Sequence, residues 1–294
     1  SNWISISGAT SSTYTTASLN VATLYRAQVT SGTCGTVNST TAAVSISEAN
    51  QSNAGNAVYN TTWANAQNDS TTGFGAWTMS TTGSGGFFTG SSDVNNANTR
   101  SWGMYSGGTG SNAANAVRTV SMGIGNKLAF SMDNSGVDTG GTIGFGLQNA
   151  SGDNLMELYF KAGDTNYTLN DNAGPVATSI AYTASGLDIT VTYTGANAYT
   201  VTITGKGGAT VTYSGRTFST RGGGQVPAQI RFFNAGAGNG PTYDLFFNSL
   251  SINNPVITTQ PASGTQSYCV GGTPTNLTVA ASGTGLTYQW YSNT

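Results

Sequence analysis

The sequence has 294 residues, contains no histidine, and only 7% of its residues are charged. Without histidine, the usual general base and the Ser-His-Asp type of catalysis are excluded. The net charge is −2 and the nine lysines and arginines form no basic cluster, so nucleic acid and anionic membranes are poor partners. No apolar run approaches the ~20 residues of a spanning helix, so we expect no membrane span. No signal peptide is recognisable, and we expect a mature or excised piece.

What the sequence does contain favours β-structure. Its 41 glycines mark many turns, and Thr, Val, Tyr and Phe are typical of strands. Because the net charge is near zero and aromatic residues recur in alternating runs, a packed all-β protein is favoured over a disordered one. A surface rich in Thr, Asn and Gly and poor in Lys is common in secreted bacterial fibres. We therefore expect an extracellular protein.

Charge divides the chain into three segments. Residues 1–47 carry one charge, Arg26, and residues 253–294 carry none, whereas all eleven carboxylates lie between Glu48 and Asp244. We therefore treat 1–47, 48–252 and 253–294 as separate parts of the chain.

The two terminal segments read as halves of one domain when 253–294 is placed before 1–47. The joined length is close to that of an immunoglobulin-like (Ig-like) sandwich, and apolar residues alternate with period two along its expected strands. Trp290 falls where such domains bury a tryptophan. In "LYRAQVT", Tyr25, Ala27 and Val29 are expected to point inward. The predicted Ig core therefore includes Trp290 and Tyr25.

Each half also carries one of the two cysteines, Cys34 and Cys269. Either they are unrelated free thiols, or they form a disulfide that staples a secreted sandwich.

Several phrases of the joined segment carry a family resemblance: "TYQWYSNT", "ISGATSSTYT", "SGTCGTVNS" and "ITTQPAS…YCVGG". They resemble the Ig-like repeats of large cell-surface proteins of Bacteroidota. The resemblance implies secretion by the type IX system and a role as an adhesin or surface fibre.

Three arrangements would complete the divided domain. The chain is one period of a tandem array, or a subunit whose open halves are completed by neighbouring copies through strand complementation, or a circular permutant closed within one chain. We rank the permutant third and expect a homotypic neighbour, either subunit or repeat, to supply the missing half.

The middle segment predicts a large antiparallel β-sandwich or jelly roll. Strand patterns include "KLAFSM", "TIGFGLQN", "NLMELYF", "LDITVTYTG", "AYTVTITG", "AQIRFFN" and "YDLFFNSLSI". "NAANAVRT" has helical propensity but lacks an apolar stripe, and we expect no long helix. The segment resembles the concanavalin-like (LamG-like) lectin and glucanase fold, in "FGAWTMSTTGSGGFFTGSS…TRSWGMYS" and "YDLFFNSLSI". These first and last strands are expected to pair.

Catalysis is not expected. A glycosidase needs two carboxylates across a cleft, yet the chain has only two glutamates, Glu48 and Glu157, and lacks the Glu-x-Asp-x-x-Glu pattern of concanavalin-fold glucanases. We expect Glu157 to pair with Arg231 or Lys161.

Carbohydrate binding is the second candidate, because exposed aromatics with Asn, Asp and Arg suit sugars. The candidate residues are Arg100, Trp102, Tyr105, Asn234, Asn239 and Tyr243. The alternative is that Trp102 and Tyr105 are core or rim aromatics.

Two further candidates concern a metal and a modification. Asp133 and Asp138, in "DNSGVDTGG", offer oxygen ligands suited to Ca²⁺, although Asp and Asn are also ordinary turn residues. No other cofactor is expected. Asp69-Ser70-Thr71 resembles the Bacteroidota O-glycosylation sequon, which makes Ser70 a candidate acceptor.

Together these features predict a structural or adhesive extracellular repeat unit that forms a cell-surface fibre. The alternative is a carbohydrate-binding, lectin-like module on Ig spacers, with surface glycans as its partners.

Overall fold

The computed structural model describes residues 3–12, 14, 23–30, 35–44, 50–69, 73–94, 100–108, 111–220, 224–253, 256–259 and 278–282. The chain divides into two compact units. Residues 1–48 and 256–282 belong to one, and residues 49–255 to the other.

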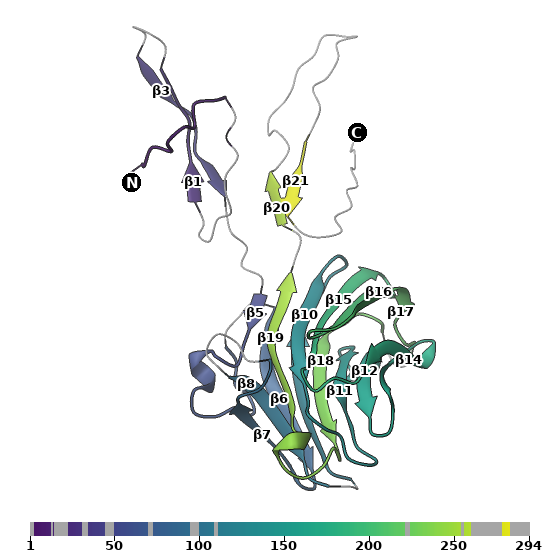
Figure 1. The fold of residues 1–294 in the computed structure, drawn as a ribbon. Coiled ribbons are helices and arrows are strands. Elements are labelled where there is room, and N and C mark those ends of the chain that lie inside the picture. The colour runs from purple at the N-terminus through teal and green to yellow at the C-terminus, as the bar shows by residue number, and fades with distance from the viewer. Residues whose placement is uncertain are drawn as a thin grey trace. The chain divides into compact units, whose positions relative to one another are not determined.

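The larger unit is a sandwich of two antiparallel β-sheets (Figure 1). The seven-stranded sheet has the order β14 (Gly174–Ala181), β13 (Asn166–Asp171), β12 (Asn154–Lys161), β11 (Thr142–Gln148), β18 (Gln229–Ala235), β9 (Ala113–Val120), β6 (Phe74–Thr82). The eight-stranded sheet has the order β17 (Thr210–Thr217), β16 (Ala198–Gly205), β15 (Leu187–Gly195), β10 (Lys127–Asp133), β19 (Leu245–Asn253), β8 (Ser101–Ser106), β7 (Gly85–Gly90), and β5 (Asn50–Ser52) also pairs with β19. Two 3-10 turns are η2 (Ala57–Tyr59) and η3 (Pro241–Tyr243). The predicted all-β sandwich is confirmed.

Period-two alternation builds the core between the sheets. In β10, Leu128, Phe130 and Met132 are buried as expected, and the residues between them are half-buried. Across the core, Phe232 of β18 stacks on Phe247 of β19, with ring centroids 3.7 Å apart and an interplanar angle of 4°. This contact joins the two sheets at the centre of the sandwich.

The segment "NAANAVRT" lies in strand β9 rather than in a loop or helix. Its alternate residues Ala114, Ala116, Arg118 and Val120 are buried. The small side chains of Ala114 and Ala116 leave room for the side chain of Arg118. Its guanidinium carbon lies 5.0 Å from the centroid of the Trp77 ring. Burial against tertiary partners therefore decides the conformation of a segment whose local propensity is helical.

Arg118 forms an ion pair with Asp69 inside the unit. The two side chains are 0% exposed, and Arg118 NH2 lies 2.7 Å from Asp69 Oδ1. The same guanidinium donates to the Gly75 carbonyl (2.5 Å), to Asn68 Oδ1 (2.8 Å) and to the hydroxyl of Ser52. The charge is therefore surrounded by acceptors, as a buried guanidinium requires.

The expected pairing of the first and last strands of the middle segment is partly right. Strands β5 and β8 both pair with the last strand, β19. Strand β6 instead forms the edge of the other sheet, beside β9. This division follows from burial, because Phe74 and Trp77 of β6 face the core from the seven-stranded sheet.

The smaller unit contains short two-stranded sheets. Strand β1 (Thr23–Tyr25) pairs with β4 (Ala42–Val44), β2 (Gln28–Thr30) with β3 (Thr36–Asn38), and β20 (Val256–Thr259) with β21 (Ala280–Ser282). In the described part of this unit, no strand pair joins the N-terminal segment to the C-terminal one.

The expected strand "LYRAQVT" is divided into β1 and β2 at Arg26 and Ala27. Tyr25 is half-buried, but Ala27 is exposed and Val29 is 64% exposed, so their expected inward orientation is not seen. Among the described strands, β3 alone pairs with β2, and Val29 is exposed there.

Several predictions lie outside the described residues. These are the Trp290 core position, the Cys34–Cys269 pair and the Ser70 acceptor. Among the residues that are described, no helix is long and apolar enough to cross a membrane.

Candidate functional site

A glycine trough lies along the centre of the seven-stranded sheet, on the face turned away from the core. In β11, Ile143, Phe145 and Leu147 fill the core, so Gly144 and Gly146 face outward. A Cβ on Gly144 would lie 2.3 Å from the Leu158 carbonyl oxygen, so no larger residue fits there. Both glycines are nonetheless buried, because side chains of the neighbouring strand β12, such as Tyr159 and Glu157, cover them.

An ion pair spans the trough. Gly146 is in register with Glu157 on β12 and with Arg231 on β18, and Arg231 NH2 lies 2.8 Å from Glu157 Oε1. This confirms Arg231 as the predicted partner of Glu157. Asn154 Nδ2 and Asn170 Nδ2 donate to the two carboxylate oxygens of Glu157, at 2.7 and 3.2 Å. The carboxylate is therefore fixed from three sides.

Burial sets the electrostatics of these groups. It lowers the pKa of Arg231, and the nearby Glu157 carboxylate opposes that effect. The guanidinium carbon of Arg231 lies 4.7 Å from the centroid of the Phe233 ring. Burial also raises the pKa of the Tyr159 phenol, and the charges of Glu157 and Asp164 add to the effect. Tyr159 is therefore a neutral hydroxyl at pH 7.

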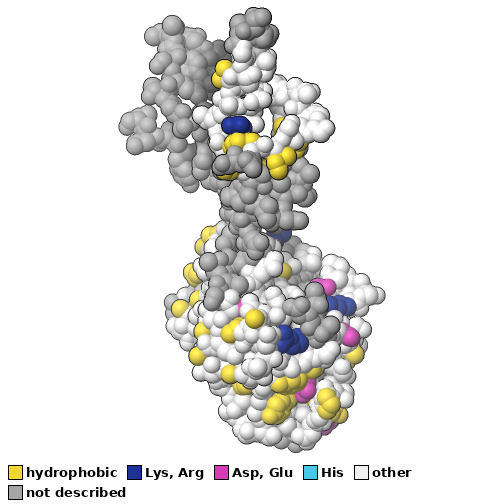
Figure 2. Space-filling view, turned by 90° about the vertical axis from the view of Figure 1, so that its left-hand side faces the viewer, with side chains coloured by type: hydrophobic (Ala, Val, Ile, Leu, Met, Phe, Trp, Pro, Cys, Tyr) yellow, Lys and Arg dark blue, Asp and Glu magenta, His cyan; other side chains and the backbone are white. Residues whose placement is uncertain are grey.

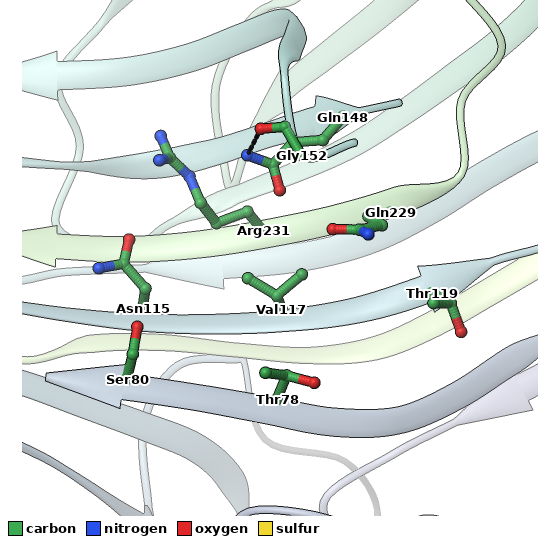
Figure 3. A pocket seen from close by; sticks show the side chains of 9 residues that line it. All are labelled: Thr78, Ser80, Asn115, Val117, Thr119, Gln148, Gly152, Gln229 and Arg231. Atoms are coloured by element: carbon green, nitrogen blue, oxygen red, sulfur yellow. Dashed lines mark hydrogen bonds between the residues drawn. The ribbon is translucent and has the colours of Figure 1, made fainter. Parts of the chain in front are cut away.

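A groove of about 410 Å³ opens on the same face, over four adjacent strands (Figure 3). Hydroxyl, amide and guanidinium groups dominate its lining: Thr78, Ser80, Asn115, Val117, Thr119, Gln148, Gly152, Gln229 and Arg231. Gln148 Nε2 donates to the Gly152 carbonyl and to Asn154 Oδ1, each at 2.8 Å. These bonds connect the groove to the Glu157 network.

Two of the predicted carbohydrate residues come together elsewhere. Tyr105 and Asn239 line a second hollow of about 330 Å³, which also includes Asp244. We call this hollow the end pocket. Tyr243 is half-buried in the adjoining η3 turn.

The other predicted carbohydrate residues have structural roles. Trp102 is 0% exposed and packs edge-on against Trp77, with ring centroids 5.2 Å apart. Asn234 is also 0% exposed and donates to the carbonyls of Met104 (3.2 Å) and Tyr243 (2.9 Å). The proposal of surface contacts for these two residues was wrong, because both fill positions that face the core.

Arg100 is also engaged within the protein. It donates to the Tyr59 carbonyl at 3.2 Å and to Asn60 Oδ1 at 2.6 Å. These bonds hold Arg100 to the segment around η2, and Arg100 lines neither the groove nor the end pocket.

The candidate calcium ligands each accept a backbone hydrogen bond. Asp133 Oδ2 accepts from the Asp93 N–H at 3.0 Å, and Asp138 Oδ1 accepts from the Thr139 N–H at 2.7 Å. Burial raises the pKa of Asp133 to about 6. Within the described ranges, no three His, Cys, Asp or Glu residues gather in a metal-binding cluster. A calcium site at Asp133 and Asp138 stays a prediction.

Sequence reasoning missed the groove, although a signal for it was present. In "AQIRFFN", alternation that buries Ile230 and Phe232 necessarily places Gln229 and Arg231 on the opposite face. Asn115 and Val117 of β9 alternate in the same way. What the sequence does not carry is the strand order that places β9, β18 and β11 side by side.

Comparison with known proteins gives a family match for the N-terminal segment alone. Residues 1–48 match the model of a domain of unknown function, DUF8696. No curated protein matches the chain.

Similar solved structures include a sialidase (TM-score 0.40, 11% identity, 53% of this chain and 15% of that one). Others are a glycosyl hydrolase family protein from Mycobacterium fortuitum (0.39, 12%, 60% and 90%) and an endo-beta-1,4-glucuronan lyase from the fungus Trichoderma reesei (0.38, 12%, 60% and 89%). The chain thus spans only a small part of the sialidase.

Proposed function

We propose that the larger unit binds a carbohydrate chain in the groove on the outer face of its seven-stranded sheet. The observation that carries the proposal is the groove itself: about 410 Å³, over four strands, beside a glycine trough and lined by uncharged polar groups and one guanidinium. Amide and hydroxyl groups donate and accept in fixed directions, which suits the hydroxyls of a sugar.

Two of the groove's polar side chains, Gln148 and Arg231, are held in position before any ligand arrives. Gln148, Asn154, Glu157 and Arg231 form one connected hydrogen-bonded network. A network of this kind lowers the entropy lost on binding, because the side chains are already ordered. Bound sugar rings would lie over β9 and β18 and contact Gln148 and Arg231 at the edge of this network.

The charge of the site favours a neutral or weakly acidic glycan over a nucleic acid. Arg231 is the cation among the groove-lining residues, and Glu157 neutralises it. Figure 2 shows a few Lys, Arg, Asp and Glu side chains on the visible face of the sandwich, among hydrophobic side chains and atoms of the backbone and the remaining residues. Phosphate-dense polymers need several cations along their path.

The same pairing supports binding without cleavage. Hydrolysis by two carboxylates needs one of them protonated and the other free to act as a nucleophile or base. Glu157 is engaged by Arg231, Asn154 and Asn170. We therefore propose a non-catalytic binding module.

The experiment is a glycan array followed by titration of the best ligand. The variant Asn115→Ala/Gln229→Ala removes two groove amides and leaves the Arg231–Glu157 pair intact. We expect it to weaken binding at least tenfold, roughly 1.4 kcal/mol. The matched control, Thr202→Ala on the outer face of the other sheet, should bind like the parent. Absence of array binding, equal loss in the control, or cleavage products in the mixture would each refute the proposal.

A fibre role is the second candidate, and one observation favours it. All residues of β2 and β3 are exposed, with Val29 at 64% and Val37 at 70%. An isolated two-stranded hairpin is marginal in water, so we propose that residues 253–294 of a neighbouring copy cover these strands at the cell surface. Light scattering and electron microscopy test this idea. A dilute monomer that never assembles on concentration would remove it.

A further inference from the structure

The end pocket is lined by three connections of the sandwich and lies beside the η3 turn. Ser84 comes from the β6–β7 turn and Tyr105 from the last part of β8. The loop between β18 and β19 adds the segment from Gly238 to Asp244. A Cβ on Gly107 would lie 2.9 Å from Ser84 Oγ and 3.0 Å from Asn239 Oδ1. Glycine at this position keeps the hollow open.

Three polar side chains of the end pocket have no partner in the described part of the protein. The Asp244 carboxylate, the Asn239 amide and the Tyr105 hydroxyl make neither a hydrogen bond nor an ion pair there. In the groove, Gln148 and Arg231 already have hydrogen-bond partners within the protein. Polar groups that line one hollow and have no partner within the protein are free to exchange hydrogen bonds with a ligand that carries several hydroxyls.

Of these three groups, the Asp244 carboxylate is the strongest hydrogen-bond acceptor. It is half-buried, and burial raises the pKa of its carboxyl to about 6. A carboxylate that has lost water without gaining a donor is poorly stabilised. Hydroxyl donors from a ligand would supply what the fold does not. No lysine or arginine lines the end pocket, so an anionic ligand would be repelled.

Tyr105 supplies an apolar surface. Its side chain is 42% exposed, and its ring lies over Gly86 in the facing strand β7. Phe88 lies beside it, with ring centroids 6.3 Å apart. The C–H face of a sugar ring packs on such an aromatic side chain while its hydroxyls reach polar neighbours.

We propose that the end pocket is a second ligand site that binds a single neutral sugar unit, such as the end of a glycan chain. The ring would lie against Tyr105, with its hydroxyls donating to Asp244 and exchanging hydrogen bonds with Asn239. A volume of about 330 Å³ is at the small end for ligand sites and suits one ring rather than a chain. The site is independent of the groove proposed above.

The test uses the whole chain, labelled with ¹⁵N, and methyl glycosides of glucose, galactose and mannose as probes. We expect at least one glycoside to shift the amide signals of Gly107, Gly238 and Gly240, with a millimolar Kd. Tyr105→Ala and Asp244→Asn should each weaken that binding at least tenfold. The groove variant Asn115→Ala/Gln229→Ala should leave it unchanged.

Three results would overturn the proposal. One is the absence of pocket shifts at about 50 mM glycoside, well above a millimolar Kd. The second is shifts confined to groove amides. The third is pocket shifts with methylammonium but with none of the glycosides, which would make Asp244 a cation site. If Tyr105→Ala lowers the Tm by more than roughly 10 °C, Asp244→Asn, which keeps the size of the side chain, decides the outcome. These results would not refute carbohydrate binding in the groove, because the groove variant is measured in a separate experiment.

Discussion

Replacing Asp69 by Asn should destabilise the larger unit strongly. Asp69 and Arg118 are 0% exposed and 2.7 Å apart, so the substitution leaves a buried guanidinium without its counter-charge. Breaking a buried pair in this way costs about 3–5 kcal/mol. Asn can still accept one hydrogen bond from Arg118, which favours the lower half of that range. For a unit of this size the Tm should fall by roughly 6–20 °C.

The assay is unfolding in urea, monitored through tryptophan fluorescence. Its matched control is Asp188→Asn. Asp188 forms an exposed pair with Lys206 at 3.9 Å, with side chains 55% and 28% exposed. Exposed pairs contribute less than about 1 kcal/mol. If Asp69→Asn costs no more than the control, water reaches the Arg118 guanidinium and the burial argument is wrong.

Three further predictions follow from individual side chains. The raised pKa of Asp133 means that its stabilising contribution is complete below about pH 4 and lost as pH rises through about 6. Asp133→Asn should remove this share, at most ~3 kcal/mol, of the stability lost between pH 4 and 7, so its urea midpoints at the two pH values should differ less than those of the parent. Asp244, whose pKa burial also raises to about 6, keeps its own share in both proteins. Trp102→Ala should cost about 3–5 kcal/mol because the ring is fully buried, whereas Tyr105→Ala should change the Tm little; equal losses would contradict the burial assignment. If Cys34 and Cys269 link neighbouring copies, non-reducing gels of concentrated protein should show covalent multimers, and a purely intrachain bond would refute this.

Much of the larger unit could be predicted from alternation alone. "KLAFSM" and "AQIRFFN" correspond to β10 and β18, with the expected residues in the core. Strand β9 was missed because alanine and asparagine give a weak pattern, and because a buried arginine reads as an exposed one. Its burial depends on Asp69, which lies 49 residues away in the sequence.

The candidate sites were harder to predict, for a physical reason. Aromatic and amide residues signal sugar binding only when exposed, and Trp102 looks the same in a core as on a surface. Strand register, which places Glu157 and Arg231 on either side of Gly146, is a long-range property. Tyr105 and Asn239 were predicted as carbohydrate-binding residues, and both line the end pocket. Asp244 was not predicted, because its place there depends on the conformation of the loop between β18 and β19.

The most direct measurement is a crystal structure of the chain with the best oligosaccharide from the array. The account predicts sugar rings across β11, β18 and β9, within hydrogen-bond distance of Asn115, Gln229 or Arg231. An oligosaccharide chain bound anywhere else on the protein, with the groove empty, would contradict it.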